Sequence, residues 1–267
     1  MAGPAILTLP ASVVLALWLP TVADGASARR AARAVVGDDV PHLVRAGIVG
    51  TPIPLPGLLG ELGAPTEVAA VLPRAGDPMG LPAGRSAEAL EAGEGVLVRR
   101  RGETGAEVCT LLVPVREEYG SAVERGEMVT WTVTADLAAH VPAPSLLLAA
   151  LPPLSQARRD IQLALSDAVE TLEDLDVARD RPDLAEDLLD LSLATVPDRL
   201  LPPGLEPARV DVLERAARLL AIVALATDDD GGAVSAGQAA LRGAALAHVE
   251  RAARRALCAA SATRAAG

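Results

Sequence analysis

The hydrophobic period of the chain changes near its middle, and this change limits the folds open to it. Segment 128–135, MVTWTVTA, alternates apolar and threonine residues, which is the period of a strand with one buried face. From residue 155 onward, apolar residues recur every three or four positions, as they do along one face of a helix. The proline-rich stretch 141–153 separates the two patterns. We therefore predict two domains, an α+β domain at 1–140 and a helical bundle domain at 141–267.

The α+β domain is expected to pack N-terminal helices on one face of a small, mostly antiparallel sheet. Short helices are predicted over about 1–62, where glycines and serines mark helix ends and starts. Strands are predicted at 66–73, 95–101, 106–115 and 128–135. The third of these contains CTLLVPV, which is apolar on both faces, so this strand should lie inside the sheet. Its short connection to the second strand predicts an antiparallel hairpin.

The second domain is expected to be all-α. Helical patterns run over 155–178, 183–195, 206–228 and 235–262. The stretch PDRLLPPGLEP separates the first pair of helices from the second pair, and DDDGG forms a tight turn within the second pair. Two such helical hairpins predict a four-helix bundle.

The composition excludes several kinds of chemistry. All 24 basic residues are arginine, so no lysine is present to form a Schiff base or to bind phosphate in a nucleotide loop. The net charge of −11 repels polyanions, and only three aromatic residues are present, so nucleic-acid binding is not expected. Cys109 and Cys258 are far apart in the sequence, which suits a reducing cytoplasm and matches no zinc-ligand spacing. We predict no catalytic residue and no cofactor.

The first 23 residues carry no charged side chain, and this segment admits two interpretations. Its apolar core, ASVVLALWLPTVADG, is compatible with an export signal or a membrane anchor. However, no basic residue precedes the core, and Pro4, Pro10 and Pro20 leave too short a run to cross a bilayer as one helix. We therefore predict a retained, buried helix or strand in a cytoplasmic protein with no membrane partner. An export or anchor segment is the alternative.

Two acid pairs at i,i+3 spacing form a candidate metal site, Glu170 with Glu173 and Asp187 with Asp190. All-α nucleotide pyrophosphohydrolases are similar in this respect, because four carboxylates on two of their helices hold Mg²⁺ against a triphosphate. A metal-dependent nucleotide hydrolase is therefore one interpretation of this chain.

Two observations favour a solvated acidic face over the metal site. Ten of the 24 residues from 167 to 190 are acidic, so a match to the spacing arises easily. An apolar stripe through Ile161, Leu165 and Val169 also predicts that the acids point away from the bundle core, where a metal site would need them. The hydrolase is kept as the alternative function.

The last predicted helix is basic, with five arginines and one glutamate between 242 and 264. Arg251, Arg254 and Arg255 are candidate anion-binding residues on it, for nucleic acid or a membrane surface. Alternatively, the helix packs beside the acidic segment 155–195, and we favour this interpretation. Anion or nucleic-acid binding is the second alternative function. His248 falls near the apolar positions of the helix and is predicted to pack inside the bundle.

Three short stretches, LALWL, GDDVPHLV and LDVARDRPD, resemble an uncharacterised protein family of high-GC Gram-positive bacteria. The abundance of alanine, glycine and arginine without lysine is also typical of a GC-rich genome. The resemblance implies no activity, ligand or catalytic residue. We therefore predict a non-enzymatic interaction or regulatory protein, whose partner is another protein or a second copy of the chain, because segregated charge on a helical bundle suits partner binding.

Overall fold

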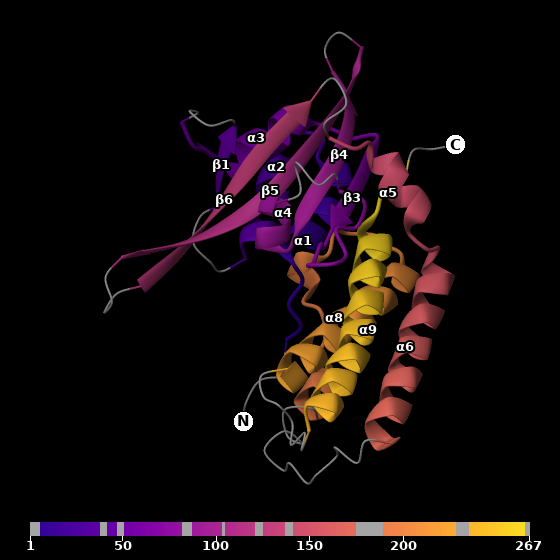
Figure 1. Cartoon of the computed structure of the whole chain (residues 1–267). Helices are drawn as coiled ribbons and strands as arrows, with labels where there is room; N and C mark the ends of the chain where they lie inside the picture. Colours follow the sequence, from indigo (N-terminus) through magenta and orange to yellow (C-terminus); the bar gives the residue numbers. More distant parts are fainter. Residues whose placement is uncertain are drawn as a thin grey trace. The chain divides into compact units, whose positions relative to one another are not determined.

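The computed structural model describes residues 6–37, 42–46, 51–81, 87–102, 105–120, 125–136, 141–174, 189–227 and 235–264. The chain divides into two compact units, and each takes in more than one segment (Figure 1). The sheet unit comprises Pro10–Leu151, Asp198–Gly204 and Ser261–Gly267, and the helical unit comprises Met1–Leu9, Pro152–Pro197 and Leu205–Ala260. Residues 141–151, 198–204 and 261–267 belong to the sheet unit and residues 1–9 to the helical unit, so the two units do not coincide with the predicted domains 1–140 and 141–267.

Backbone pairing holds the short segments within their units. In the helical unit, the N–H of Leu7 donates to the carbonyl of Thr195 at 3.0 Å. In the sheet unit, Val68 and Thr263 exchange two hydrogen bonds, at 3.0 and 2.9 Å. Isolated pairings of this kind join residues distant in sequence and produce no periodic pattern, so the sequence does not predict them.

A six-stranded sheet forms the centre of the sheet unit in the described residues, with strand order β2-β1-β6-β5-β4-β3. Its strands are β1 Leu43–Ala46, β2 Ile53–Pro54, β3 Glu67–Val71, β4 Gly95–Arg101, β5 Glu107–Gly120 and β6 Arg125–Asp136. Neighbouring strands are antiparallel except β1 and β6, which are parallel. The β4–β5 hairpin and the interior position of β5 are confirmed.

The sheet is larger than predicted, and it is mixed. Its two additional strands, β1 and β2, lie within 1–62, where the sequence predicts short helices. With four and two residues, these strands are too short to show an alternating pattern. Pro54 ends β2 at the edge of the sheet, where a residue without an N–H is tolerated.

Five α-helices surround the sheet in the described residues: α1 Ala11–Trp18, α2 Gly25–Val36, α3 Leu55–Leu62, α4 Ala87–Ala92 and α5 Pro144–Ala150. Two 3-10 turns, η1 Leu19–Thr21 and η2 Asp198–Leu200, complete the unit. α1 packs against β3 and β4, and α2 packs against both α1 and α3. The predicted N-terminal helices are therefore present and form a layer on the sheet (Figure 1).

The charge-free N-terminal segment contains α1, and every residue from Ser12 to Trp18 is buried. Residues 12–18 are thus part of the core of the sheet unit. None of the helices in the described ranges is long and apolar enough to cross a membrane.

The described part of the helical unit contains α6 Leu154–Asp174, α8 Pro207–Thr227, α9 Ala236–Ser261 and a helical stretch at 189–193. These elements match parts of the four helices that the sequence predicts, with α6 beginning one residue earlier than expected. Residues 175–188 and 228–234 lie outside the described residues, so the full lengths of the predicted helices stay predictions.

Arginine side chains connect the elements of the helical unit. Arg209 Nη1 on α8 donates to the carbonyl of Ala260 on α9 at 3.1 Å. Arg218 on α8 donates to the carbonyls of Leu191 and Ala194, at 2.9 and 2.8 Å. These carbonyls lie in the last turn of the 189–193 stretch and just beyond it, and the carbonyl of Leu191 also accepts from the backbone N–H of Ala194 at 3.3 Å.

Candidate functional site

The helical unit has a groove between α6 and α9, with a volume of about 350 Å³. Three buried alanines form its floor, namely Ala157 and Ala164 from α6 and Ala256 from α9. Because alanine side chains are short, the larger residues beside them stand above the floor and form walls.

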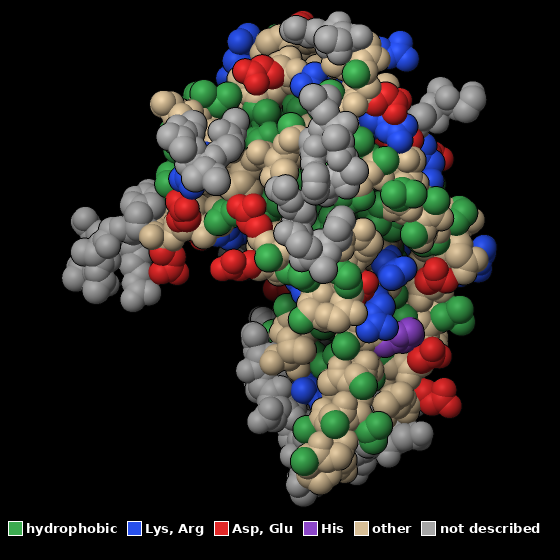
Figure 2. Space-filling model, turned by 45° about the horizontal axis from the view of Figure 1, so that its top comes forward, with side chains coloured by type: hydrophobic (Ala, Val, Ile, Leu, Met, Phe, Trp, Pro, Cys, Tyr) green, Lys and Arg blue, Asp and Glu red, His purple; other side chains and the backbone are tan. Residues whose placement is uncertain are grey.

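The wall contributed by α6 is acidic and the wall contributed by α9 is basic. α6 presents Asp160, Leu163 and Asp167, which are spaced by three and four residues and so lie on one face of the helix. α9 presents a similar face composed of His248, Arg251 and Arg255. Figure 2 shows acidic, basic and histidine side chains gathered on this part of the surface.

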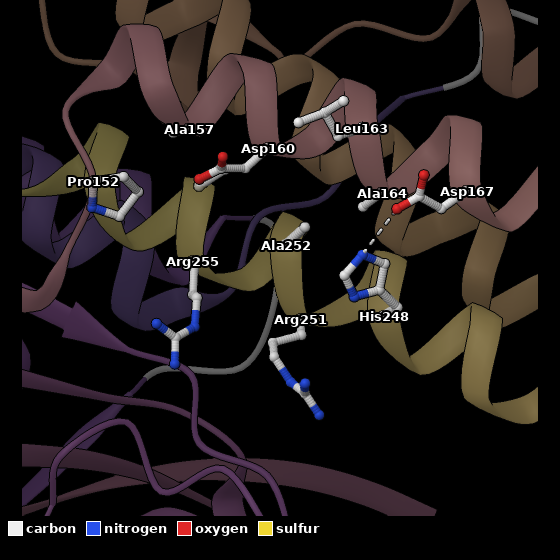
Figure 3. Close-up of a pocket in the computed structure, with 11 residues that line it drawn as sticks. Pro152, Ala157, Asp160, Leu163, Ala164, Asp167, His248, Arg251, Ala252 and Arg255 are labelled. Atoms are coloured by element: carbon white, nitrogen blue, oxygen red, sulfur yellow. Dashed lines mark ion pairs between the residues drawn. The ribbon is translucent and has the colours of Figure 1, made fainter.

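Figure 3 shows that Asp160 lies level with Arg255, and that Asp167 lies level with His248. Residue numbers rise along α6 while they fall along α9, so the two helices are antiparallel. The Oδ2 atom of Asp167 is 3.9 Å from Nε2 of His248. Both side chains are more than half exposed, so this pair contributes only about 0–1 kcal/mol. This ion pair therefore does little to hold the two walls together.

α9 and the described first part of the acidic segment, α6, line one groove, so these two parts lie near each other as predicted. The acids at 175–188 lie outside the described residues, and their proximity to α9 stays a prediction. The prediction for His248 is wrong, because its side chain is 53% exposed and lines the groove. The predicted buried stripe of α6 is also rotated, since Val169 is 45% exposed while Ala157, Ala164 and Ala168 are buried beside Ile161. The alanines at 157, 164 and 168 mark the buried face of α6 in the sequence better than its larger apolar residues do.

The structure separates the three candidate anion-binding arginines. Arg251 and Arg255 line the same groove. Arg254 is only 3% exposed, and its Nε lies 3.6 Å from Oε1 of Glu250 one turn earlier on α9. Consecutive helical residues are about 100° apart, so Arg254 cannot share the direction of Arg255.

The candidate metal ligands are described only in part. Glu170 and Asp190 are exposed. The side chain of Glu173 and the whole of Asp187 lie outside the described residues. Among the side chains that the structure describes, no three from His, Cys, Asp and Glu come together in a way that could hold a metal ion. The metal site thus stays a prediction.

Sequence reasoning missed the buried carboxylate of Glu94 in the sheet unit. Its Oε2 accepts a hydrogen bond from the backbone N–H of Ser12 at 2.8 Å. This N–H lies in the first turn of α1, which has no side-chain cap of its own, so Glu94 satisfies one of the helix's unpaired donors. Burial raises the pKa of the Glu94 carboxyl, while the Ser12 hydrogen bond and the charges of Arg116 and Arg74 lower it in part.

We expect Glu94→Gln to stabilise the sheet unit at neutral pH and to change it little at acid pH. A pKa that is higher in the folded state gives a contribution that is full below the ordinary value of 4.5 and is lost as pH rises through the folded-state pKa. Glutamine can still accept from Ser12 and carries no charge to bury. Melting temperatures across this pH range check the prediction, with the exposed Glu91→Gln on α4 as the control. If the melting temperatures of wild type and Glu94→Gln differed by the same amount at acid and at neutral pH, the prediction would be contradicted.

These features define a class: a two-unit α/β protein with a mixed six-stranded sheet in one unit and a charged groove between helices in the other. Two family models match the chain. The Rv1486c-like protein N-terminal domain matches residues 12–146, and the Rv1486c-like protein C-terminal domain matches residues 155–258. The chain therefore belongs to the Rv1486c-like protein family. No curated protein and no solved structure matched it.

Proposed function

We propose that this member of the Rv1486c-like family is a non-enzymatic interaction or regulatory protein that binds a protein partner along the α6–α9 groove. The observation that carries the proposal is Leu163, whose side chain is 60% exposed on the groove wall between two aspartates. A large apolar side chain at the centre of a charged groove is suited to a protein surface that brings both apolar and charged groups.

The distribution of exposed apolar residues supports this proposal. Seven large apolar side chains are exposed in the described residues, and the helical unit holds all of them except Leu146. The six are Ile6, Leu163, Val169, Leu189, Leu193 and Leu241. Of these six, Leu163 lines the groove, so it is the one that the proposed partner would contact.

The mixed charge of the groove favours a protein partner over a polyanion. Arg251 and Arg255 would attract phosphates, but Asp160 and Asp167 on the facing wall would repel them. The net charge of −11 adds to this repulsion. A protein segment with both acidic and basic side chains can complement both walls at once.

We further propose that the protein works in the cytoplasm and comes from a high-GC Gram-positive bacterium. Neither Cys109 nor Cys258 forms a disulfide, as a reducing compartment favours. Basic residues that are all arginine support the proposed source.

Site-specific photo-crosslinking tests the proposed function. A photoreactive amino acid is placed at position 163 or, as the matched control, at position 169, in the full chain expressed in its source cells. Leu163 and Val169 are both exposed on α6 but lie about 120° apart around the helix. We expect a defined protein adduct from position 163 and little from position 169. Adducts with nucleic acid alone, or equal yields from the two positions, would contradict the proposal.

A further inference from the structure

We infer that the partner in the groove is a second copy of this chain, bound groove to groove about a two-fold axis that runs along the groove. This inference rests on the proposed function and names its partner. The observation behind it is that one surface carries an acidic wall and a basic wall side by side, on α6 and α9. A surface of this kind can complement itself, as the interface of a two-fold dimer must.

The direction of the axis follows from the charges. When two copies face each other across an axis parallel to the groove, the rotation exchanges the α6 side and the α9 side. As a result, α6 of one copy lies over α9 of the other. The acidic wall then meets the basic wall at two equivalent contacts. An axis across the groove would instead place α6 over α6 and α9 over α9, with like charges opposed, which is unfavourable. The segregation of charge therefore selects the first arrangement.

The same axis also fixes the register. Rotation about an axis along the groove leaves every side chain at its own level along the helices. Asp160 lies level with Arg255 within one copy, and Asp167 lies level with His248 (Figure 3). In the dimer, Asp160 of one copy therefore lies over Arg255 of the other, and Asp167 lies over His248. Both contacts pair opposite charges when the histidine is protonated.

The apolar centre of the groove is compatible with this register. Leu163 lies between Asp160 and Asp167 along α6, so in the dimer it falls over the middle of the facing α9 wall. That wall has Ala252 and the aliphatic stem of Arg251 at this level. The short alanine leaves room for the leucine, and an arginine stem covers apolar surface while its charged end stays in water. Dimer formation would thus bury Leu163.

A charge-reversal experiment on the full chain tests this inference. Sedimentation equilibrium should give the wild type a mass of twice 27.2 kDa at low salt, and raised salt should weaken the association. Asp160→Arg alone places arginine over Arg255, and Arg255→Asp alone places aspartate over Asp160. We expect each single variant to raise the dissociation constant of its homodimer by about tenfold or more.

Mixing the two single variants is the decisive measurement. A mixed dimer pairs the introduced arginine with the introduced aspartate at one contact and the native Asp160 with the native Arg255 at the other. We therefore expect the mixture to dimerise again. The intramolecular neighbours of each chain do not change on mixing, so a loss caused by misfolding would not be repaired.

Leu163→Asp and Val169→Asp provide an independent pair of variants. We expect the first to abolish the dimer and the second to leave it intact, with circular dichroism confirming that both are folded. A wild type that stays monomeric at all concentrations, or a mixture of reversal variants that stays monomeric, would overturn the inference. If the chain is monomeric while position 163 still crosslinks to a different protein, only the identity of the partner is wrong. If position 163 captures no protein either, the proposed function fails as well.

Discussion

Trp131→Ala is expected to lower the free energy of unfolding of the sheet unit by about 3–5 kcal/mol. Trp131 on β6 is fully buried and lies opposite Val44 of β1 and Pro114 of β5. Its indole Nε1 donates to Nδ1 of His42 at 3.2 Å, just before β1 begins. The substitution would leave a cavity at the centre of the sheet. It would also remove the hydrogen bond to His42, which lies beside the parallel strand pair β1–β6.

Urea denaturation followed by tryptophan fluorescence measures this effect. Trp18 on α1 is the other tryptophan of the chain and also belongs to the sheet unit, so its emission still reports this unit in the variant. Trp131→Phe is the matched control, because it keeps most of the apolar volume while it removes the hydrogen bond. We expect it to lose about 1–2 kcal/mol. A loss below about 1 kcal/mol for Trp131→Ala would contradict the buried position of this side chain.

Arg254→Ala is expected to destabilise the helical unit by about 2–4 kcal/mol. The side chain is 3% exposed, and its removal would leave the partly buried Glu250 without this ion-pair partner. Arg251→Ala on the exposed groove wall should change stability by no more than about 0.5 kcal/mol. Thermal unfolding followed by circular dichroism compares the two variants. Because a buried pair is screened little by ions, raised salt should not hide the loss in Arg254→Ala. Equal effects of the two substitutions would contradict this distinction.

Long periodic segments made most of the fold predictable. β4, β5, β6, α8 and α9 each carry enough residues to show a period of two or of about 3.6, and the sequence predicts all of them. β1 and β2 are too short to show a period. Their place in the sheet depends instead on partners far along the chain, since β1 lies beside β6. Local sequence carries no information about such a partner.

The candidate site was predictable only in outline. Charge segregation predicted that the basic helix would lie beside the acidic one. It could not show which charges share a groove, because that depends on how α6 is rotated about its own axis. The alanines of α6 set this rotation by packing inward, and they leave Leu163 exposed on the groove wall. Arg254 and Arg255 are adjacent in sequence, yet one is buried and the other lines the groove.

The most direct test of the central claim is whether a partner covers the groove in the cell. Leu163→Cys and Val169→Cys, each in a chain whose Cys109 and Cys258 are replaced by serine, would be labelled with a maleimide in intact cells and as dilute purified protein. Leu163 is 60% exposed and Val169 is 45% exposed, so the thiol at 163 should react at least as fast as the thiol at 169 in the dilute protein. We predict that the thiol at 163 becomes the slower of the two in cells, because the partner covers it. A thiol at 163 that reacts as fast in cells as it does in dilute solution, relative to position 169, would contradict the claim.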